Sequence, residues 1–278
     1  MRWTRGILAV GILLCGCSRE PGYSQSSPEA TITTAQAMVK NGDAKLLVKL
    51  IYSDDQNMSR CLNRLGHALG RLQQLAVELQ KRFPADVQKL RQDLQTQAGS
   101  GAISGLTQAF GGGRGSGRRA PRDGDPATTA LTRLFAAPYQ VLEEEGTNLS
   151  ALKLDDKTYS LLYKNGPIIP AVPILIKKDE RDGRWYFILP LDLPILRGYF
   201  YRTDDAWKTY TALVATLDNI VKDLLQDVQE GKVQSLNDTA RVAGEKAFTS
   251  LPFAIIALDR LTAAERKKQG LDAPVPPK

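Results

Sequence analysis

The sequence predicts a mainly helical α+β protein. Two long stretches, within residues 59–83 and 204–231, repeat apolar residues at alternating spacings of three and four, which is the period of an amphipathic helix face. Between them, residues 146–189 carry short alternating runs separated by turn residues, a pattern typical of antiparallel strands. We therefore expect long amphipathic helices packed on a small antiparallel β-sheet.

The chain begins with a secretory signal. Two basic residues, Arg2 and Arg5, precede an apolar run that ends at Leu14. This run is too short to be a retained membrane helix, because spanning the hydrocarbon layer takes about 20 apolar residues. The residues that follow, Cys15, Gly16 and Cys17, place small residues before a cleavage point.

The end of this signal resembles the bacterial lipobox, with Leu14 three places and Gly16 one place before Cys17. The resemblance implies cleavage after Gly16 and acylation of Cys17 with lipid such as palmitate. It also implies a lipoprotein of the cell envelope that is anchored in a membrane and faces the periplasm. Ser18, standing where an Asp would retain the protein, implies the outer membrane in the enteric sorting scheme. The alternative is an ordinary secretory signal with an unlipidated Cys17.

Cysteine content and charge restrict the mature chain further. Once Cys15 is cleaved and Cys17 acylated, only Cys61 remains, so no intrachain disulfide can form. We expect Cys61 to be a small buried hydrophobe, the alternatives being an intermolecular disulfide or a reactive thiol. The formal net charge of +7 falls to about +5 without Arg2 and Arg5. Nucleic acid is not an expected partner in an envelope compartment.

Composition divides the chain into six parts. They are a signal peptide (1–16), a lipidated polar tether (17–27), an N-terminal helical part (28–98), a Gly/Arg-rich flexible insertion (99–126), an α+β part (127–270) and a disordered tail (271–278). We expect 28–98 and 127–270 to form one domain.

The first half of the chain carries clear helix boundaries. Ser27 and Pro28 provide an N-cap and a first helical residue, and the helix is expected to stop at Asn41-Gly42. Asp43 can cap a second, short helix. The next helix, 59–83, carries an apolar stripe, and we expect it to pack within the same molecule rather than in a coiled coil with a partner. Pro84 ends it, and a further helix follows at an angle.

The second half begins helical, with Asp125-Pro126 capping a helix that Pro138 divides. Two hairpins follow, one around residues 155–157 and one with its turn at residues 179–183. The helix 204–231 carries the second apolar stripe, and we expect the two stripes to pack as an antiparallel pair. The apolar run around Pro252, within a last helix, is expected to be core rather than membrane contact.

No catalytic, cofactor-binding or metal-binding residue is predicted. The only histidine, His67, falls on the expected solvent face and has no cluster of metal ligands at suitable spacing. The paired acids are expected to cap helices and turns. They are Asp54-Asp55, Asp155-Asp156, Asp179-Glu180, Asp204-Asp205 and the run Glu143-Glu144-Glu145.

The Gly-rich run at 111–117 lacks the strand and the Gly-Lys-Ser/Thr of a phosphate loop. The arginines around it, Arg114, Arg118, Arg119 and Arg122, could contact an envelope protein or another anionic surface. We favour the alternative that they form a solvated linker.

Two segments resemble the nuclear-transport-factor-2-like, or cystatin-like, α+β fold. Residues 27–51 resemble its opening helix pair, and residues 182–189 (DGRWYFIL) resemble its late strand. The resemblance implies a curved sheet whose concave pocket can hold a ligand. The acids, tyrosines or histidines that enzymes of this fold use cannot be assigned in this chain.

Two functions remain open at this point. The favoured one is a membrane-anchored, non-enzymatic binding or assembly module. The alternative is a small-ligand carrier or enzyme that uses the pocket of a cone-shaped α+β fold. A closed apolar pocket with convergent polar groups, such as Tyr159, Tyr163 or Tyr186, would favour the alternative, and a filled core with an exposed apolar groove would favour the first.

Overall fold

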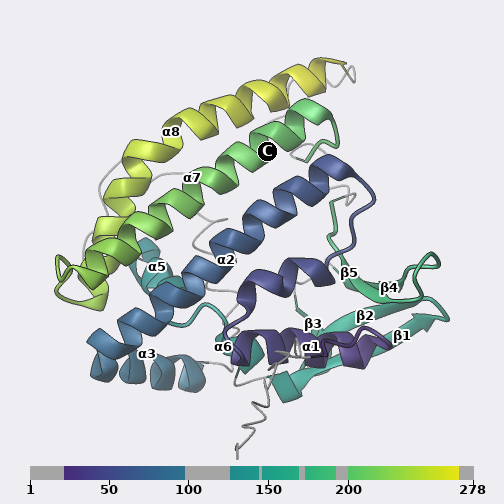
Figure 1. Ribbon diagram of the computed structural model, residues 1–278, viewed down its shortest axis with the longest axis horizontal. Helices are drawn as coiled ribbons and strands as arrows, with labels where there is room; N and C mark the ends of the chain where they lie inside the picture. The colour runs from purple at the N-terminus through teal and green to yellow at the C-terminus, as the bar shows by residue number, and fades with distance from the viewer. Residues whose placement is uncertain (1–21, 98–125, 144–145, 169–172, 192–199, 269–278) are drawn as a thin grey trace, which may run out of the picture.

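The computed structural model describes residues 22–97, 126–143, 146–168, 173–191 and 200–268. Their fold is predominantly helical α+β, with long helices arranged beside a small antiparallel sheet (Figure 1). The predicted fold class is confirmed.

The N-terminal elements attach the start of the chain to the sheet. Helix α1 (Pro28–Lys40) begins at the predicted N-cap, Ser27, whose hydroxyl accepts a hydrogen bond from the Ala30 N–H at 3.0 Å. The short second helix, η1 (Ala44–Leu50), is a 3₁₀ helix, and Asp43 makes no side-chain cap for it. Asp43 instead accepts a hydrogen bond from the Tyr23 hydroxyl at 2.7 Å.

Residues 23–25, within the expected tether, lie against the body. Trp185 donates its backbone N–H to the Gln25 carbonyl at 3.0 Å, and the Gln25 side chain donates to the Trp185 carbonyl at 2.8 Å. The Tyr23 bond to Asp43 adds a third attachment. The chain therefore enters the folded body beside α1 and strand β5.

The first amphipathic helix is the long α2 (Gln56–Arg82). Asp55 caps it, and Pro84 starts the next helix, α3 (Pro84–Gln97), as predicted. Gln73 ties α2 to the preceding turn, because its buried amide accepts from the Ala44 N–H at 2.9 Å and donates to the Val39 carbonyl at 2.7 Å.

Pro138 divides the next helix as expected. The resulting pieces are α5 (Pro126–Ala136) and α6 (Gln140–Glu143), followed by the short η3 (Gly146–Asn148). Residues Phe135 and Ala136 of α5 are buried in the main helical cluster.

The sheet has five antiparallel strands, and both predicted hairpins are present. The first joins β1 (Leu149–Asp155) to β2 (Thr158–Tyr163), and the second joins β4 (Ile174–Lys178) to β5 (Trp185–Ile188). The order is β1-β2-β4-β5, and the short β3 (Gly166–Pro167) also pairs with β2.

Alternation along the strands gives the sheet two different faces. Ile176 and Trp185 point to one face and are buried with Leu161 against Ile32 of α1. Thr158 and Lys177, which are paired across β2 and β4, belong to the other face.

The second amphipathic helix, α7 (Asp204–Gln229), packs along α2, and the last helix, α8 (Leu236–Lys268), packs along α7 (Figure 1). The expected pairing of the two stripes is therefore correct, but their expected antiparallel orientation is wrong. The start of α2 meets the start of α7, because Met58 and Cys61 cluster with Trp207 and Tyr210. The ends meet as well, since Leu75 and Leu79 cluster with Leu224 and Val228. The two helices are parallel because the chain between them returns through the sheet to the end where α2 began.

A buried carboxylate joins α2 to α7 midway along their contact. The Asp218 side chain is fully buried and lies 3.1 Å from Arg64 Nη2 and 2.7 Å from Arg71 Nη1. The two arginines stand about two helical turns apart on α2, and about a third of each side chain is exposed. One acid thus pairs with two bases inside the helical layer, and the group keeps one net positive charge.

Candidate functional site

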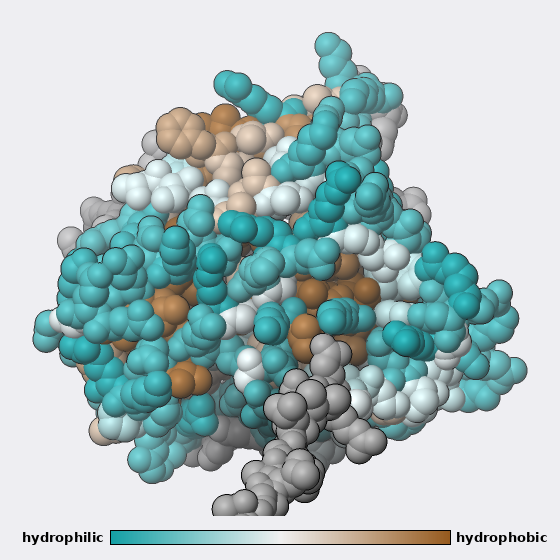
Figure 2. Space-filling model, viewed as in Figure 1, coloured by the Kyte–Doolittle hydropathy of each residue, from teal (hydrophilic) through white to brown (hydrophobic). Residues whose placement is uncertain are grey.

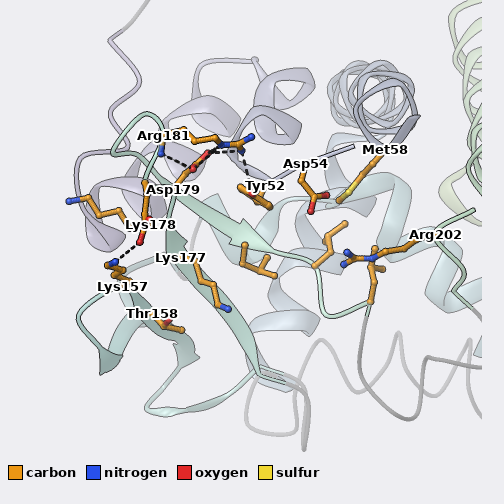
Figure 3. A pocket seen from close by; sticks show the side chains of 14 residues that line it. Tyr52, Asp54, Met58, Lys157, Thr158, Lys177, Lys178, Asp179, Arg181 and Arg202 are labelled. Carbon is orange, nitrogen blue, oxygen red and sulfur yellow. Dashed lines mark hydrogen bonds and ion pairs between the residues drawn. The ribbon is translucent and has the colours of Figure 1, made fainter. Parts of the chain in front are cut away.

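An open cleft of about 660 Å³ lies between the start of α2 and the face of the sheet opposite α1 (Figure 3). Its walls come from the segment before α2, from β2 and β4, from the turn between β4 and β5, and from the segments flanking residues 192–199. The lining includes Tyr52, Asp54, Met58, Thr158, Lys177, Ile188, Leu189, Leu191 and Arg202.

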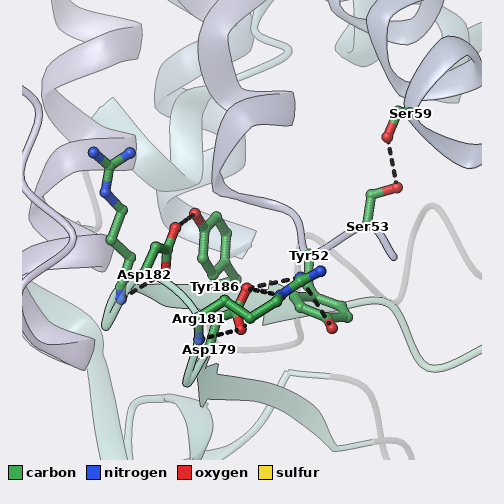
Figure 4. A network of polar contacts seen from close by, with 8 residues as sticks. Tyr52, Ser53, Ser59, Asp179, Arg181, Asp182 and Tyr186 are labelled. Atoms are coloured by element: carbon green, nitrogen blue, oxygen red, sulfur yellow. Dashed lines mark hydrogen bonds and ion pairs between the residues drawn. The ribbon is translucent and has the colours of Figure 1, made fainter. Parts of the chain in front are cut away.

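One rim of the cleft is a network centred on Arg181 (Figure 4). Its guanidinium donates to both carboxylate oxygens of Asp179, with the shortest distance 2.8 Å, and to the Tyr52 hydroxyl at 3.3 Å. The Arg181 Cζ also lies 5.5 Å from the centre of the Tyr52 ring, a cation–π distance. The hydrogen bonds from Arg181 hold the pKa of Asp179 below its ordinary value, so this rim pair is charged at neutral pH.

A second ion pair, Lys157 with Glu180, closes the neighbouring part of the rim (Figure 3). The hydrogen bond from Lys157 lowers the pKa of Glu180, and the same contact raises the pKa of Lys157. Each of the two rim acids, Asp179 and Glu180, is therefore paired with a cation.

Several predicted acids serve local structure, as expected. Asp55 accepts from the Asn57 N–H at 2.8 Å at the start of α2, and Asp155 accepts from the Lys157 N–H at 2.8 Å in the first hairpin. Asp204 and Asp205 lie in the first turn of α7. These carboxylates hold turns and helix ends.

The tyrosines that the sequence suggested for a closed pocket point to different places. The Tyr159 ring packs edge-on against Trp185 at 5.2 Å, and the Tyr186 hydroxyl donates to Asp182 at 2.6 Å. Tyr163 lies beneath the Lys164 ammonium. None of the three lines the cleft, and the tyrosine that does, Tyr52, was not predicted. The one feature of the sequence that could have indicated this cleft was Lys177, because it is a charged residue at an outward-facing position of an alternating strand.

His67 and Cys61 occupy the environments that the sequence predicts. His67 is exposed on α2, and Cys61 is buried beside Tyr210. Burial raises the pKa of the Cys61 thiol, which keeps it protonated and unreactive at neutral pH. Among the residues that the structure describes, no group of three or more His, Cys, Asp or Glu side chains could hold a metal ion.

The last helix carries a large exposed apolar surface. Phe248, Phe253, Ile255 and Ile256 of α8 are 71%, 81%, 55% and 49% exposed, respectively. Figure 2 shows apolar residues gathered along the edge of the molecule where α8 lies in Figure 1. The expectation that this run is core is wrong, because α7 covers only the inner side of α8. We call these four residues the α8 face.

Helix α8 is also the one helix in the described part of the chain that is long and apolar enough to cross a membrane. This statement rests only on the length and the composition of the helix. Its first turns belong to the protein core through Leu236 and Ala243, and Leu258 and Leu261 pack against the Trp207 cluster.

The remaining predicted site residues lie outside the described residues. These are the lipid-attachment residue Cys17 and the insertion arginines Arg114, Arg118, Arg119 and Arg122. In comparisons with known proteins, no family model, curated protein or solved structure matches the chain.

Proposed function

We propose that the protein is a membrane-anchored lipoprotein of the cell envelope that acts as a non-enzymatic binding module. The leader that ends at Cys17 supports the anchor. The observation that carries the binding role is the α8 face, the outer surface of the last helix. Apolar patches of this kind on a folded surface mark contact sites, because leaving them in water is unfavourable.

Within the described structure, the point where the chain enters the body and the α8 face lie on opposite sides (Figure 1). The chain enters the body beside α1, and the elements α1, η1, α2, α7 and α8 then follow one another across it (Figure 1). Packed helices are about 8–10 Å apart, so the α8 face, which lies beyond α2 and α7, is on the order of 30 Å from α1. The five peptide steps from Cys17 to Gly22 span at most about 18 Å.

This geometry supports a protein partner for the α8 face. In this proposal, an acyl group on Cys17 holds the α1 side near its membrane and the α8 face away from it. Two copies anchored side by side would both direct their α8 faces away from it. The proposed occupant is an amphipathic helix of another protein, reached from the aqueous side.

The charges next to the α8 face indicate what that helix carries. Arg260 and Lys267 are exposed on the turns that follow the face, and Asp259 is the only exposed acid there between residues 257 and 268. A partner helix that places acidic residues beyond its apolar stripe would complement this end. Packing such a stripe on the α8 face is a recognised mode of helix binding.

Photocrosslinking in intact cells tests the docking surface. A photoreactive phenylalanine analogue at Phe253 should crosslink to one protein, at a peptide that forms an amphipathic helix, and Ile256→Ser should weaken that crosslink at least fivefold. The same analogue at the exposed His67 is the matched control and should not give this product. Crosslinks only to lipid, only to a second copy, or equally from both positions would overturn the proposal.

The anchor is tested separately by Cys17→Ser. We expect this chain to lose incorporation of labelled fatty acid and to leave the membrane fraction. If it stays in the membrane fraction without acylation, attachment through α8 replaces the proposed anchor.

A further inference from the structure

We propose that the cleft between α2 and the sheet binds an amphipathic anion, meaning a carboxylate or phosphate attached to an apolar body. The proposal concerns a different surface from the α8 face and rests on how charge and apolar groups are distributed in the cleft. Its volume of about 660 Å³ lies in the range of small-molecule sites.

The cleft has an apolar floor. Met58 belongs to the buried Trp207 cluster and presents one edge to the cleft. Ile188 lines the cleft from the end of β5, and Leu189 and Leu191 line it from the segment that follows. Leu189 and Leu191 also pack on that same cluster, so this floor is continuous with the protein core. A ligand resting there would remove apolar surface from water on both sides.

Cations exceed acids on the walls. Asp179 and Glu180 are neutralised by Arg181 and Lys157. The Lys177 ammonium is exposed and makes no ion pair with any residue in the described ranges. Beyond these two ion pairs the lining holds Lys177 and Lys178 against one further acid, Asp54, so positive charge exceeds negative charge on the walls without counting Arg202.

The sheet register places two donors together. Thr158 and Lys177 are directly paired across β2 and β4, and both line the cleft. Side chains at paired positions on one face lie about 5 Å apart at Cβ. A hydroxyl beside an ammonium suits one anionic oxygen group, and the charge-assisted bond from Lys177 would be the stronger contact.

The opposite wall determines which way round the ligand binds. Asp54 lines the cleft near Met58, so an anionic group there would be repelled (Figure 3). The anionic end therefore lies toward Thr158 and Lys177, and the apolar body extends along Ile188 and Leu189. A free fatty acid and the phosphate end of a lipid fragment share this chemistry.

Calorimetric titration of the mature chain carrying Cys17→Ser, which has no acyl group, tests the site. The probes are decanoate and octyl phosphate, with octyl glucoside and octyltrimethylammonium as neutral and cationic counterparts, all below their micelle concentrations. We expect one or both anions to bind, and whichever binds better indicates a carboxylate or a phosphate ligand. Lys177→Gln should weaken that binding about tenfold, and Thr158→Val should weaken it less.

Two control variants distinguish binding in the cleft from binding elsewhere on the surface. Lys222→Gln removes an exposed lysine from α7 and should leave the affinity unchanged. Ile256→Ser alters the α8 face and should also leave it unchanged, so failure of the docking proposal and failure of this one are distinguishable. Absence of anion binding up to about 1 mM, equal binding of the cationic probe, or equal effects of Lys177→Gln and Lys222→Gln would overturn the proposal.

Discussion

Asp218 shows how one residue governs the contact between two helices. It is fully buried, and its carboxylate faces the guanidinium groups of Arg64 and Arg71. Removing one member of a buried ion group is costly because the remaining charges lose their partner. The two arginines here reach water with about a third of each side chain, which moderates that cost.

We therefore predict that Asp218→Asn lowers the free energy of unfolding by about 2–3 kcal/mol. Urea denaturation followed by circular dichroism measures it. Asp223→Asn, at an exposed position on the same helix, should change the stability by less than about 0.5 kcal/mol. Similar small effects for both variants would show that the buried ion group contributes little.

The sequence predicted the surroundings of some residues and not of others. His67 and Cys61 could be placed, because a regular helix with an apolar stripe assigns each position to a face. Asp218 and Gln73 could not, because their partners come from elements far away in the sequence. Lys177 and Tyr52 were missed for the same reason, since the register of two strands and a parallel bridge at Ile51 bring them to one cleft.

At the scale of elements, α2 packs closely against the backbone of η1, in addition to burying its apolar stripe. A Cβ atom at Gly66 would lie 2.6 Å from the Lys45 carbonyl oxygen of η1. Non-bonded carbon and oxygen atoms do not come this close. The obstacle is a backbone carbonyl, which cannot move aside as a flexible side chain could. The glycine in the middle of this helix is therefore a packing requirement.

We predict that Gly66→Ala destabilises the protein by about 1–3 kcal/mol, although alanine is intrinsically the better helix former. Thermal or urea unfolding gives the value. The neighbouring His67→Ala, on the solvent side, serves as the control and should be neutral or slightly stabilising. A Gly66→Ala protein more stable than the parent would mean that α2 and η1 are further apart than described.

Element boundaries were predicted well, but their orientation was not. Ser27, Pro84 and Pro138 mark the ends of helices through local backbone chemistry, which a sequence displays directly. The direction in which α7 lies on α2 depends on where the sheet returns the chain. Apolar spacing is the same for parallel and antiparallel pairs, so the stripes alone could not decide it.

At the scale of the whole molecule, the helical clusters combine both halves of the chain. Leu75 and Leu79 from the first half are buried with Phe135, Leu224 and Val228 from the second. Neither half can bury its stripe without the other. The expected parts 28–98 and 127–270 therefore share a core.

We predict one cooperative unfolding transition for the whole chain. Trp185 reports on the sheet cluster and Trp207 on the helical cluster. In the single variants Trp185→Phe and Trp207→Phe of the chain from Cys17 onward, which lacks Trp3, the remaining tryptophan should give the same urea midpoint as circular dichroism, once each variant's own stability is accounted for. Separate midpoints for the sheet and helical signals within one variant would show that the two regions unfold independently.

The packing of α2 on α7 also affects when the chain can fold during its synthesis. Met58 meets Trp207, a partner about 150 residues later in the chain. Contacts over such separations close slowly, and they cannot begin before the later residue is made. While α7 is still to be translated, α2 can pack on η1 and α5 but lacks its main partner, and the growing chain has no finished helical core. A chain that cannot complete its core until late in its synthesis remains open to passage through an export channel, the route that the proposed lipoprotein leader would require.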